Sequence, residues 1–176
     1  MMLCISIRLA NINDVEALRD LSITTFWDTF SQANKKKYMD QYIAEAMSIG
    51  QLSKELNDDR NKFFLAYIDD SLVGYTKMRT IETPEELKSG NPIEIERIYV
   101  SKEYHSKKVG AALMDHSINY AINNNHDVIW LGVWEHNYKA VDFYKRWGFT
   151  LFGSHIFMLG PDAQTDVLMK RELTSK

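Results

Sequence analysis

Short apolar, β-branched runs alternate with helically periodic stretches along the whole chain, and this alternation constrains the fold more than any other sequence feature. Strands are predicted at 3–9, 62–68, 72–80, 93–100, 128–134, 150–158 and 165–170. Helices are predicted from Asn13 to about Phe30, twice within 31–60 as short surface helices, at about 109–124, and after Asn137. Strands interleaved with helices, without an internal repeat, indicate a mixed α/β sheet.

Turn and cap signals support this division. Asp69-Asp70-Ser71 separates two apolar runs and predicts a hairpin, and Asn13 with Glu16 resembles a capping box. Residues 83–92 carry two of the three prolines and form the most flexible connection predicted. Because neither side of that segment has enough elements to close a core, residues 1–176 are expected to form a single domain.

Charge and hydropathy exclude several classes of protein. The 176 residues include 21 basic and 24 acidic side chains, so the net charge of −3 gives no overall basic field and nucleic-acid binding is not expected. The longest apolar runs, 63–68 and 128–134, are far shorter than the roughly 20 residues of a membrane span. The first residues lack a basic leader, and the single Cys4 cannot form an internal disulfide. We therefore expect a cytoplasmic protein without membrane association.

One candidate site lies where strand 93–100 passes through a polar loop into the helix that begins at Val109. A helix N-terminus with small residues presents free N–H groups and a positive dipole end, which suit a phosphate or pyrophosphate. His105, Lys107 and Lys108 add positive charge there. The alternative is a solvated turn before an ordinary helix.

A second candidate site is the pattern Asn137-x-x-Ala140-x-x-Phe143-Tyr144-x-x-x-Gly148-Phe149, in which Asn137 is expected to cap a helix and Gly148 to end it. Taken alone, a tyrosine on an apolar helical stripe, such as Tyr144, is more often a core residue whose hydroxyl finds a backbone partner than a catalyst.

The strand at 93–100 carries two carboxylates. Strict alternation predicts that Glu94, Glu96, Ile98 and Val100 share one face. Two carboxylates together on one strand face are unusual in a structural strand.

Both candidate sites, in this order and spacing, resemble the GNAT superfamily of acyl-CoA-dependent N-acetyltransferases. The family's pyrophosphate motif, Q/R-x-x-G-x-G/A, falls on residues 105–110, and its A-x-x-F-Y-x-x-x-G-F element matches residues 140–149. A likeness to the PaiA-type spermidine/spermine acetyltransferases of Gram-positive bacteria covers nearly the whole chain. It rests on residues 25–30, 95–99, 129–135 and 164–166, and its most specific string is Trp-Leu-Gly-Val-Trp-Glu at 130–135.

The resemblance implies a fold and a cofactor. The fold is a twisted, mostly antiparallel sheet of about seven strands, flanked by helices and splayed between strands 93–100 and 128–134. Acetyl-CoA would bind in the splay, with its pantetheine arm beside strand 93–100 like an added strand; no metal is implied. The implied cofactor-binding residues are Ile98, Tyr99, Val100, His105, Ser106, Lys107, Lys108, Val109, Gly110, Ala111, Asn137 and Tyr144.

The sequence departs from the family motif at two positions, where His105 replaces Gln or Arg and Lys108 replaces the first glycine. A lysine at position 108 must either adopt ordinary backbone angles or hold the loop away from the phosphates. Gly132 fits a kink that opens the sheet, although a glycine in a strand can also mark tight packing.

The resemblance also implies catalytic roles. Amine acetylation needs a group that removes a proton from the ammonium and an acid that protonates the leaving thiolate. Glu96 is the favoured base, Glu94 the second candidate or an outer recognition charge, and Tyr144 the acid. The alternative for both carboxylates is ion pairing with Arg97, Lys77 or Arg79.

The acceptor implied is a small-molecule amine, a polyamine in the first place. Trp27, Asp28, Glu96, Trp134 and Glu135 would form an acidic, aromatic groove for a long cation, although a solvated helix face and core aromatics explain the same residues. Two other hypotheses stay open: an enzyme for another amine, and a non-catalytic acyl-CoA-binding regulator, favoured by Lys108 and the lysines at 35–37. The oligomeric state, monomer or homodimer, is also open.

Overall fold

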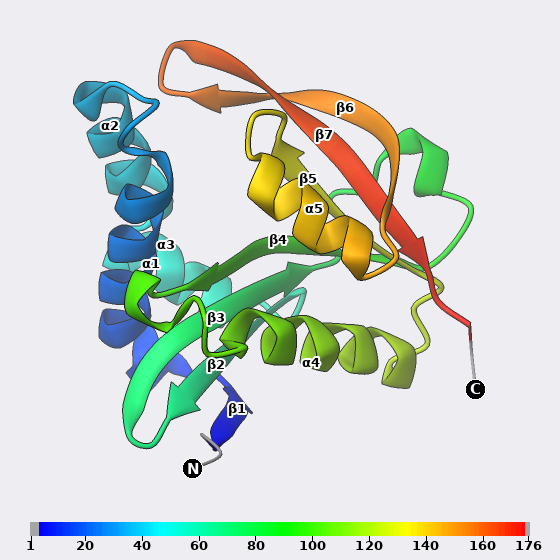
Figure 1. The fold of residues 1–176 in the computed structure, drawn as a ribbon, viewed down its shortest axis with the longest axis horizontal. Coiled ribbons are helices and arrows are strands. Elements are labelled where there is room, and N and C mark those ends of the chain that lie inside the picture. The colour runs from blue at the N-terminus through cyan, green and yellow to red at the C-terminus, as the bar shows by residue number, and fades with distance from the viewer. Residues whose placement is uncertain (1–3, 175–176) are drawn as a thin grey trace.

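The computed structural model describes residues 4–174 and contains seven strands in one mixed sheet, in the order β1-β2-β3-β4-β5-β7-β6 (Figure 1). The strand count and the mixed α/β class confirm the sequence prediction. Residue 3, the predicted start of the first strand, lies outside the described part. The strands are β1 (Ile5–Leu9), β2 (Asn61–Ile68), β3 (Ser71–Arg79), β4 (Pro92–Val100), β5 (Val128–Trp134), β6 (Thr150–Leu159) and β7 (Asp162–Glu172).

The helices also match the predicted segments. They are α1 (Val15–Phe30), α2 (Lys36–Ala46), α3 (Ile49–Leu56), α4 (Val109–Asn123) and α5 (Tyr138–Arg146), and short 3₁₀ turns occupy Ile12–Asp14, Glu85–Leu87 and Lys102–Tyr104. None of the helices in the described part of the chain is both long and apolar enough to cross a membrane.

The sheet splays apart between β4 and β5, as the resemblance implied. These two strands are parallel and pair only from Pro92 to Glu94, against Val128 to Trp130. Beyond that point β4 continues along β3 as far as Val100, while β5 continues along β7 as far as Trp134. The edge of β4 after Glu94 therefore faces an opening instead of a neighbouring strand.

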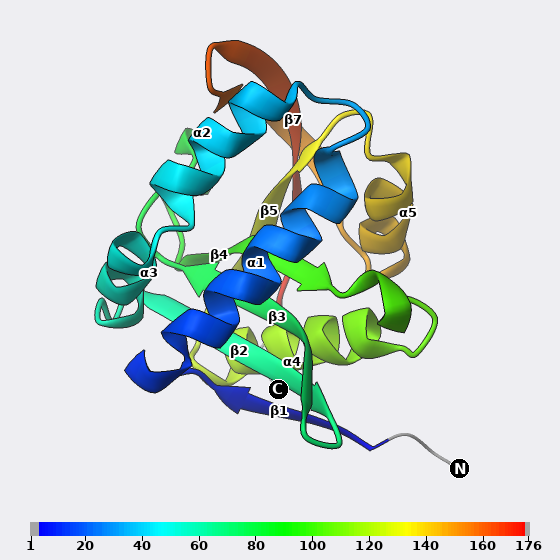
Figure 2. The ribbon, with the colours of Figure 1, turned by 90° about the vertical axis from the view of Figure 1, so that its left-hand side faces the viewer.

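Helices cover the two faces of the sheet differently (Figure 2). On one face α4 and α5 pack on a core that includes Ile95, Ile118 and Tyr144. On the other face α1 and α3 pack on β2 and β3 through Leu18, Leu52 and other apolar side chains. Farther along that face, the β6–β7 hairpin reaches α2. The splay lies between these layers, so it is bounded by both helical faces.

A β-bulge at Glu96 corrects the predicted strand faces. Lys77 of β3 pairs with Arg97, whereas the next residue of β3 pairs with Ile95, so the alternation of β4 slips by one residue at Glu96. Ile98 and Val100 consequently pack toward α4. Glu94 lies on the opposite face from them, so the prediction that it shares a face with Ile98 and Val100 is wrong.

Local caps agree with the sequence in part. Asn137 accepts a hydrogen bond from the Ala140 N–H at 3.3 Å, and Gly148 ends α5 with φ of +82°, as predicted. The predicted capping box of Asn13 and Glu16 is wrong, because Asn11 and Asp14 form that box around the preceding 3₁₀ turn. The predicted hairpin at 69–71 is confirmed.

Candidate active site

A cavity of about 750 Å³ occupies the splay between β4 and β5. It begins at the N-terminus of α4, passes the free edge of β4, and continues to α1 and the β6–β7 hairpin. Of the predicted site residues, those that line it are Asp28, Glu94, Glu96, Ile98, Tyr99, Val100, His105, Gly110, Trp134, Asn137 and Tyr144.

The turn before α4 contains a strained lysine. Lys108 is the N-cap of α4 and has φ of +64° and ψ of 12°, a left-handed conformation that glycine adopts without steric penalty. The expectation of ordinary backbone angles at this position is therefore wrong, and the other expectation, a loop held away from the phosphates, stays a prediction. The side chain of Lys108 makes no capping hydrogen bond to the first turn, so the N–H groups at this helix start are not capped by that residue.

The residues of the predicted phosphate site divide into those that line the cavity and those that do not. His105 and Gly110 line the cavity, and the His105 imidazole lies 2.9 Å from the Val100 carbonyl oxygen through Nε2. Val109 is fully buried in the core below the helix, where it packs in the cluster of α4 with β3. The other predicted members, which do not line the cavity, are Ser106, Lys107, Lys108 and Ala111.

Tyr144 reaches the cavity from α5. Its side chain is buried, with its ring 5.6 Å from that of Phe143 and 6.0 Å from that of Phe149 between ring centroids. Burial raises the pKa of the Tyr144 phenol, so the group stays protonated at neutral pH. The residue is thus both part of the core and a wall of the cavity.

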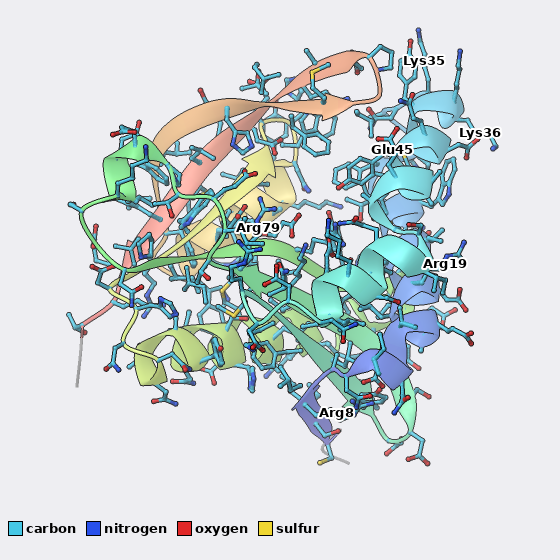
Figure 3. The ribbon with its side chains drawn as sticks, turned by 180° about the vertical axis from the view of Figure 1, so that it is seen from behind. Arg8, Arg19, Lys35, Lys36, Glu45 and Arg79 are labelled. Carbon is cyan, nitrogen blue, oxygen red and sulfur yellow. The ribbon has the colours of Figure 1, made fainter. Side chains whose placement is uncertain are left out.

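Two buried cations, Lys77 and Arg97, and the half-buried Arg79 hold the two carboxylates of β4. Glu94 accepts hydrogen bonds from Nε and Nη2 of Arg79, so both of its oxygens face one guanidinium. Glu96 forms an ion pair with Lys77, and its Oε1 lies 3.3 Å from Arg79 and 3.7 Å from Arg97. Arg79 ends β3, where it pairs with Glu94 of β4, and it is labelled near the middle of the view in Figure 3. The alternative of ion pairing therefore describes the contacts of both glutamates, although the pairs are buried.

The same contacts separate the acid–base properties of the two glutamates. Burial raises the pKa of Glu94 above its ordinary value, and the opposing effect of Arg79 is smaller. Burial acts the same way on Glu96, but the positive charges of Arg97, Lys77 and Arg79 together lower its pKa below the ordinary value. Glu96 is the weaker proton acceptor of the two.

The predicted acceptor groove is only partly assembled. Asp28 and Trp134 line the cavity, and Trp134 packs edge-on against Phe30 at 6.4 Å. Trp27 instead packs below the ammonium of Lys36, which lies 5.7 Å from its ring. The Glu135 carboxylate lies 3.8 Å from His136, outside this cavity. These two positions correct the predicted groove, since neither side chain faces it.

The sequence analysis did not identify His155 as a site residue, and it named Asp166 only within a segment that resembles a known family. His155 of β6 lines the cavity, and its Nε2 lies 3.4 Å from Oδ2 of Asp166 on β7. Asp166 belongs to the segment 164–166, which carries part of the resemblance. No motif or spacing indicated His155, because it becomes a neighbour of Asp166 only through the pairing of β6 with β7.

Charge is divided along the cavity. The end formed by α4 and α5 is lined by the basic or imidazole side chains of Lys102, His105, Lys139 and Arg146. The end formed by α1, β4 and the β6–β7 hairpin carries the carboxylates of Asp28, Glu94, Glu96 and Asp166, two of which are paired with cations. An anionic group is favoured at the first end and a cationic group at the second. Among the described residues there is no group of three or more side chains that could hold a metal ion.

Comparisons with known proteins agree with this geometry. The family model described as Acetyltransferase (GNAT) family matches residues 22–149. An uncharacterized N-acetyltransferase from the pepI 3′ region of Lactobacillus delbrueckii subsp. lactis is 34% identical over 153 residues, which cover 87% of this chain and 88% of that protein. A spermidine N(1)-acetyltransferase of Thermoplasma acidophilum is 26% identical over 114 residues, covering 62% of this chain and 66% of the relative.

A PaiA N-acetyltransferase of Thermoplasma acidophilum, solved in complex with coenzyme A, superposes with a TM-score of 0.81 and 23% identity, covering 97% of this chain and 99% of that one. The ribosomal-protein-S18-alanine N-acetyltransferase of Escherichia coli superposes with a TM-score of 0.72 at 14% identity, covering 98% of this chain and 96% of that one. At these identities the likeness shows a shared fold, and the two solved proteins are named for different roles.

Proposed function

Since this chain belongs to the acetyltransferase (GNAT) family, we propose that it transfers the acetyl group of acetyl-CoA to a primary amine and that the amine is a polyamine. The single observation that carries this proposal is the cavity in the splay, with a free strand edge along one side and opposite charge preferences at its two ends.

The residues around the splay fit the shape and charge of acetyl-CoA. The backbone of β4 from Ile98 to Val100 lines the cavity where β5 has diverged, so an extended amide-containing arm can pair with it as a strand would. The start of α4 and the basic side chains of Lys102, Lys139 and Arg146 suit the phosphates at the other end of the molecule. Acetyl-CoA supplies the activated thioester.

We assign three further roles to residues of this chain. A backbone N–H near Ile98 would donate a hydrogen bond to the thioester oxygen as negative charge develops on it. Asn137 fixes the start of α5 and so the position of Tyr144. Tyr144 would protonate the departing sulfur, because its phenol is protonated at neutral pH and borders the cavity.

A cationic acceptor is supported by the carboxylates at the far end of the cavity. Asp28 comes from α1 and Asp166 from β7, and within residues 4–174 neither makes an ion pair with lysine or arginine. A polyamine places ammonium groups along a flexible chain, so one can react while another remains near a carboxylate. The similarity to a spermidine acetyltransferase supports the same acceptor class.

Glu96 remains the predicted base, but its contacts weigh against that role. A carboxylate held by three cations is a poor proton acceptor, and its negative charge is already neutralised. We propose that Glu96 shapes the bulge of β4 and keeps Lys77 and Arg97 paired.

Thiol release tests the proposed function. Acetyl-CoA is mixed with spermidine, spermine, a monoamine, an aminoglycoside and a peptide with a free N-terminus, and both free thiol and acetylated product are measured. The proposal expects turnover with the polyamines, at a higher kcat/KM than with the monoamine. If acetyl-CoA binds but no amine is acetylated, the non-catalytic regulator becomes the better description.

A further inference from the structure

A histidine–aspartate pair lies at the acceptor end of the cavity. His155 and Asp166 are direct cross-strand partners on β6 and β7, and Nε2 of the imidazole lies 3.4 Å from Oδ2 of the carboxylate. The Asp166 side chain is only 16% exposed, whereas that of His155 is 44% exposed and borders the cavity. The aspartate is thus fixed within the sheet and the imidazole remains accessible.

Gly132 provides the space in which the imidazole lies. This residue is on β5, beside the splay, in regular register with Leu168 of β7. A Cβ at position 132 would be 3.4 Å from both Cε1 and Nε2 of His155, and 3.6 Å from Oδ2 of Asp166. A Cβ there would only touch the ring, so a side chain longer than that of alanine would displace the imidazole from its place over β5. Of the two explanations that the sequence offered for Gly132, a kink in the strand or tight packing, the structure favours tight packing, because β5 keeps its register with β7 through this residue.

We propose that His155, oriented by Asp166 and accommodated by Gly132, is the group that removes the proton from the acceptor amine. This inference rests on the proposed acetyl transfer and assigns its proton acceptor to a residue that the sequence did not single out. A tautomer with its proton on Nε2, toward Asp166, leaves Nδ1 with the lone pair that accepts the proton.

The surroundings of the three candidate bases favour His155. Both oxygens of Glu94 accept hydrogen bonds from Arg79, and Glu96 is surrounded by three cations. The charged groups around His155 are the carboxylates of Asp166 on β7, Glu94 on β4 and Glu82 before β4. The guanidinium of Arg79 on β3 pairs with both Glu94 and Glu82, so Asp166 is the carboxylate of this group that acts on the imidazole without a paired cation.

These carboxylates set the proton affinity of the imidazole. Asp166 raises the pKa of His155, and the more distant charges of Glu94 and Glu82 act in the same direction against the effect of burial. An imidazole with a pKa above its ordinary value is matched to proton transfer near neutral pH.

The proton and electron balance of the step is complete. The ammonium gives one proton to His155, which passes it to solvent after the reaction. The neutral nitrogen then forms a bond to the acetyl carbon, and the carbon–sulfur bond breaks with its electron pair on sulfur. Tyr144 gives its proton to that sulfur and regains one from the nitrogen, so the products are the amide, free CoA thiol and one released proton.

The test compares the pH dependence of kcat for the full chain and its variants, with acetyl-CoA and spermidine at saturation. His155→Gln should lower kcat by about 100-fold and remove the acidic limb of the profile. Asp166→Asn should move that limb to lower pH, because it removes the charge that raises the pKa of His155. Gly132→Leu should lower kcat by displacing the ring, and His126→Gln, which alters a half-buried histidine outside the cavity, should leave the profile unchanged.

Acetyl-CoA affinity, measured by calorimetry on the same variants, distinguishes lost catalysis from lost folding and should change by less than about twofold. If the unaltered protein acetylates spermidine and His155→Gln keeps both its kcat and its acidic limb, the assignment of His155 is overturned while the proposed function stands. If the unaltered protein binds acetyl-CoA and acetylates no amine of the panel, the proposed function fails, and the role of His155 fails with it.

Discussion

Replacing Lys108 by glycine should stabilise the protein, although the substitution removes a side chain from the start of a helix. Lys108 has φ of +64°, and the left-handed region costs a residue with a Cβ about 1–2 kcal/mol. Glycine removes that cost but loses about 0.5–1 kcal/mol through the greater freedom of the unfolded chain. The net expectation is a gain of about 0–1.5 kcal/mol in the free energy of unfolding, or about 0.75 kcal/mol at the midpoints of the two ranges.

For a chain of this length, the midpoint gain corresponds to a rise in Tm of about 1.5–3 °C. Thermal and urea unfolding, each followed by circular dichroism, measure it. Lys107→Gly is the matched control, because it removes the same charge from the adjacent residue, which does not have a positive φ. It should lower stability by about 0.5–1 kcal/mol. If Lys108→Gly destabilises the protein as much as Lys107→Gly does, the argument from backbone strain is refuted.

The other predictions follow from the contacts of single side chains. Lys108→Gly should leave acetyl-CoA affinity unchanged or raise it, and a clear loss in calorimetry would instead indicate a contact between the ammonium and a phosphate. Tyr144→Phe should lower kcat by about 10- to 100-fold with little change in acetyl-CoA affinity, and unchanged turnover would limit Tyr144 to packing. Asp28→Asn should raise KM for spermine more than for a monoamine, whereas Glu135→Gln, outside the cavity, should not; equal effects of Asp28→Asn on both amines would remove Asp28 from acceptor recognition. Glu96→Gln should lower stability at pH 7 by about 1.5–3 kcal/mol, because the buried Lys77 loses one of its two carboxylates and keeps the other, Glu55, at 2.9 Å. Because folding lowers the pKa of Glu96, its stabilisation is complete above pH 4.5 and is lost as pH falls through the lower folded-state value. Urea midpoints at pH 3 and pH 7 should therefore differ less in Glu96→Gln than in the unaltered protein, and an equal difference would contradict the sign of this shift.

Local sequence signals predicted the elements but not the local irregularities that shape the site. Apolar periodicity and turn signals identified the seven strands and five α-helices of the described residues, because most of these elements bury one face or stripe. It could not reveal the bulge at Glu96, since alternation continues through the sequence while the pairing slips by one residue. The faces of Ile98 and Val100 were consequently reversed.

The same division applies to the site residues: local spacing predicted some of them, and strand pairing brings the others together. Tyr144, Asn137 and the edge of β4 were predicted from segments whose spacing is local. His155 and Asp166 meet through strand pairing, and Gly132 approaches His155 from β5. Likewise, Trp27 and Glu135 carry suitable chemistry for a cationic acceptor, but the directions of their side chains depend on helix and loop geometry that composition does not specify.

The measurement that tests the central claim most directly is detection of the acetylated product. The purified chain is incubated with acetyl-CoA and spermidine, free thiol is followed continuously, and the product is identified by mass spectrometry. The account predicts one equivalent of thiol for each equivalent of N-acetylspermidine, at a rate that depends on the enzyme concentration. Thiol release without an acetylated amine, or binding of acetyl-CoA without either product, would contradict it.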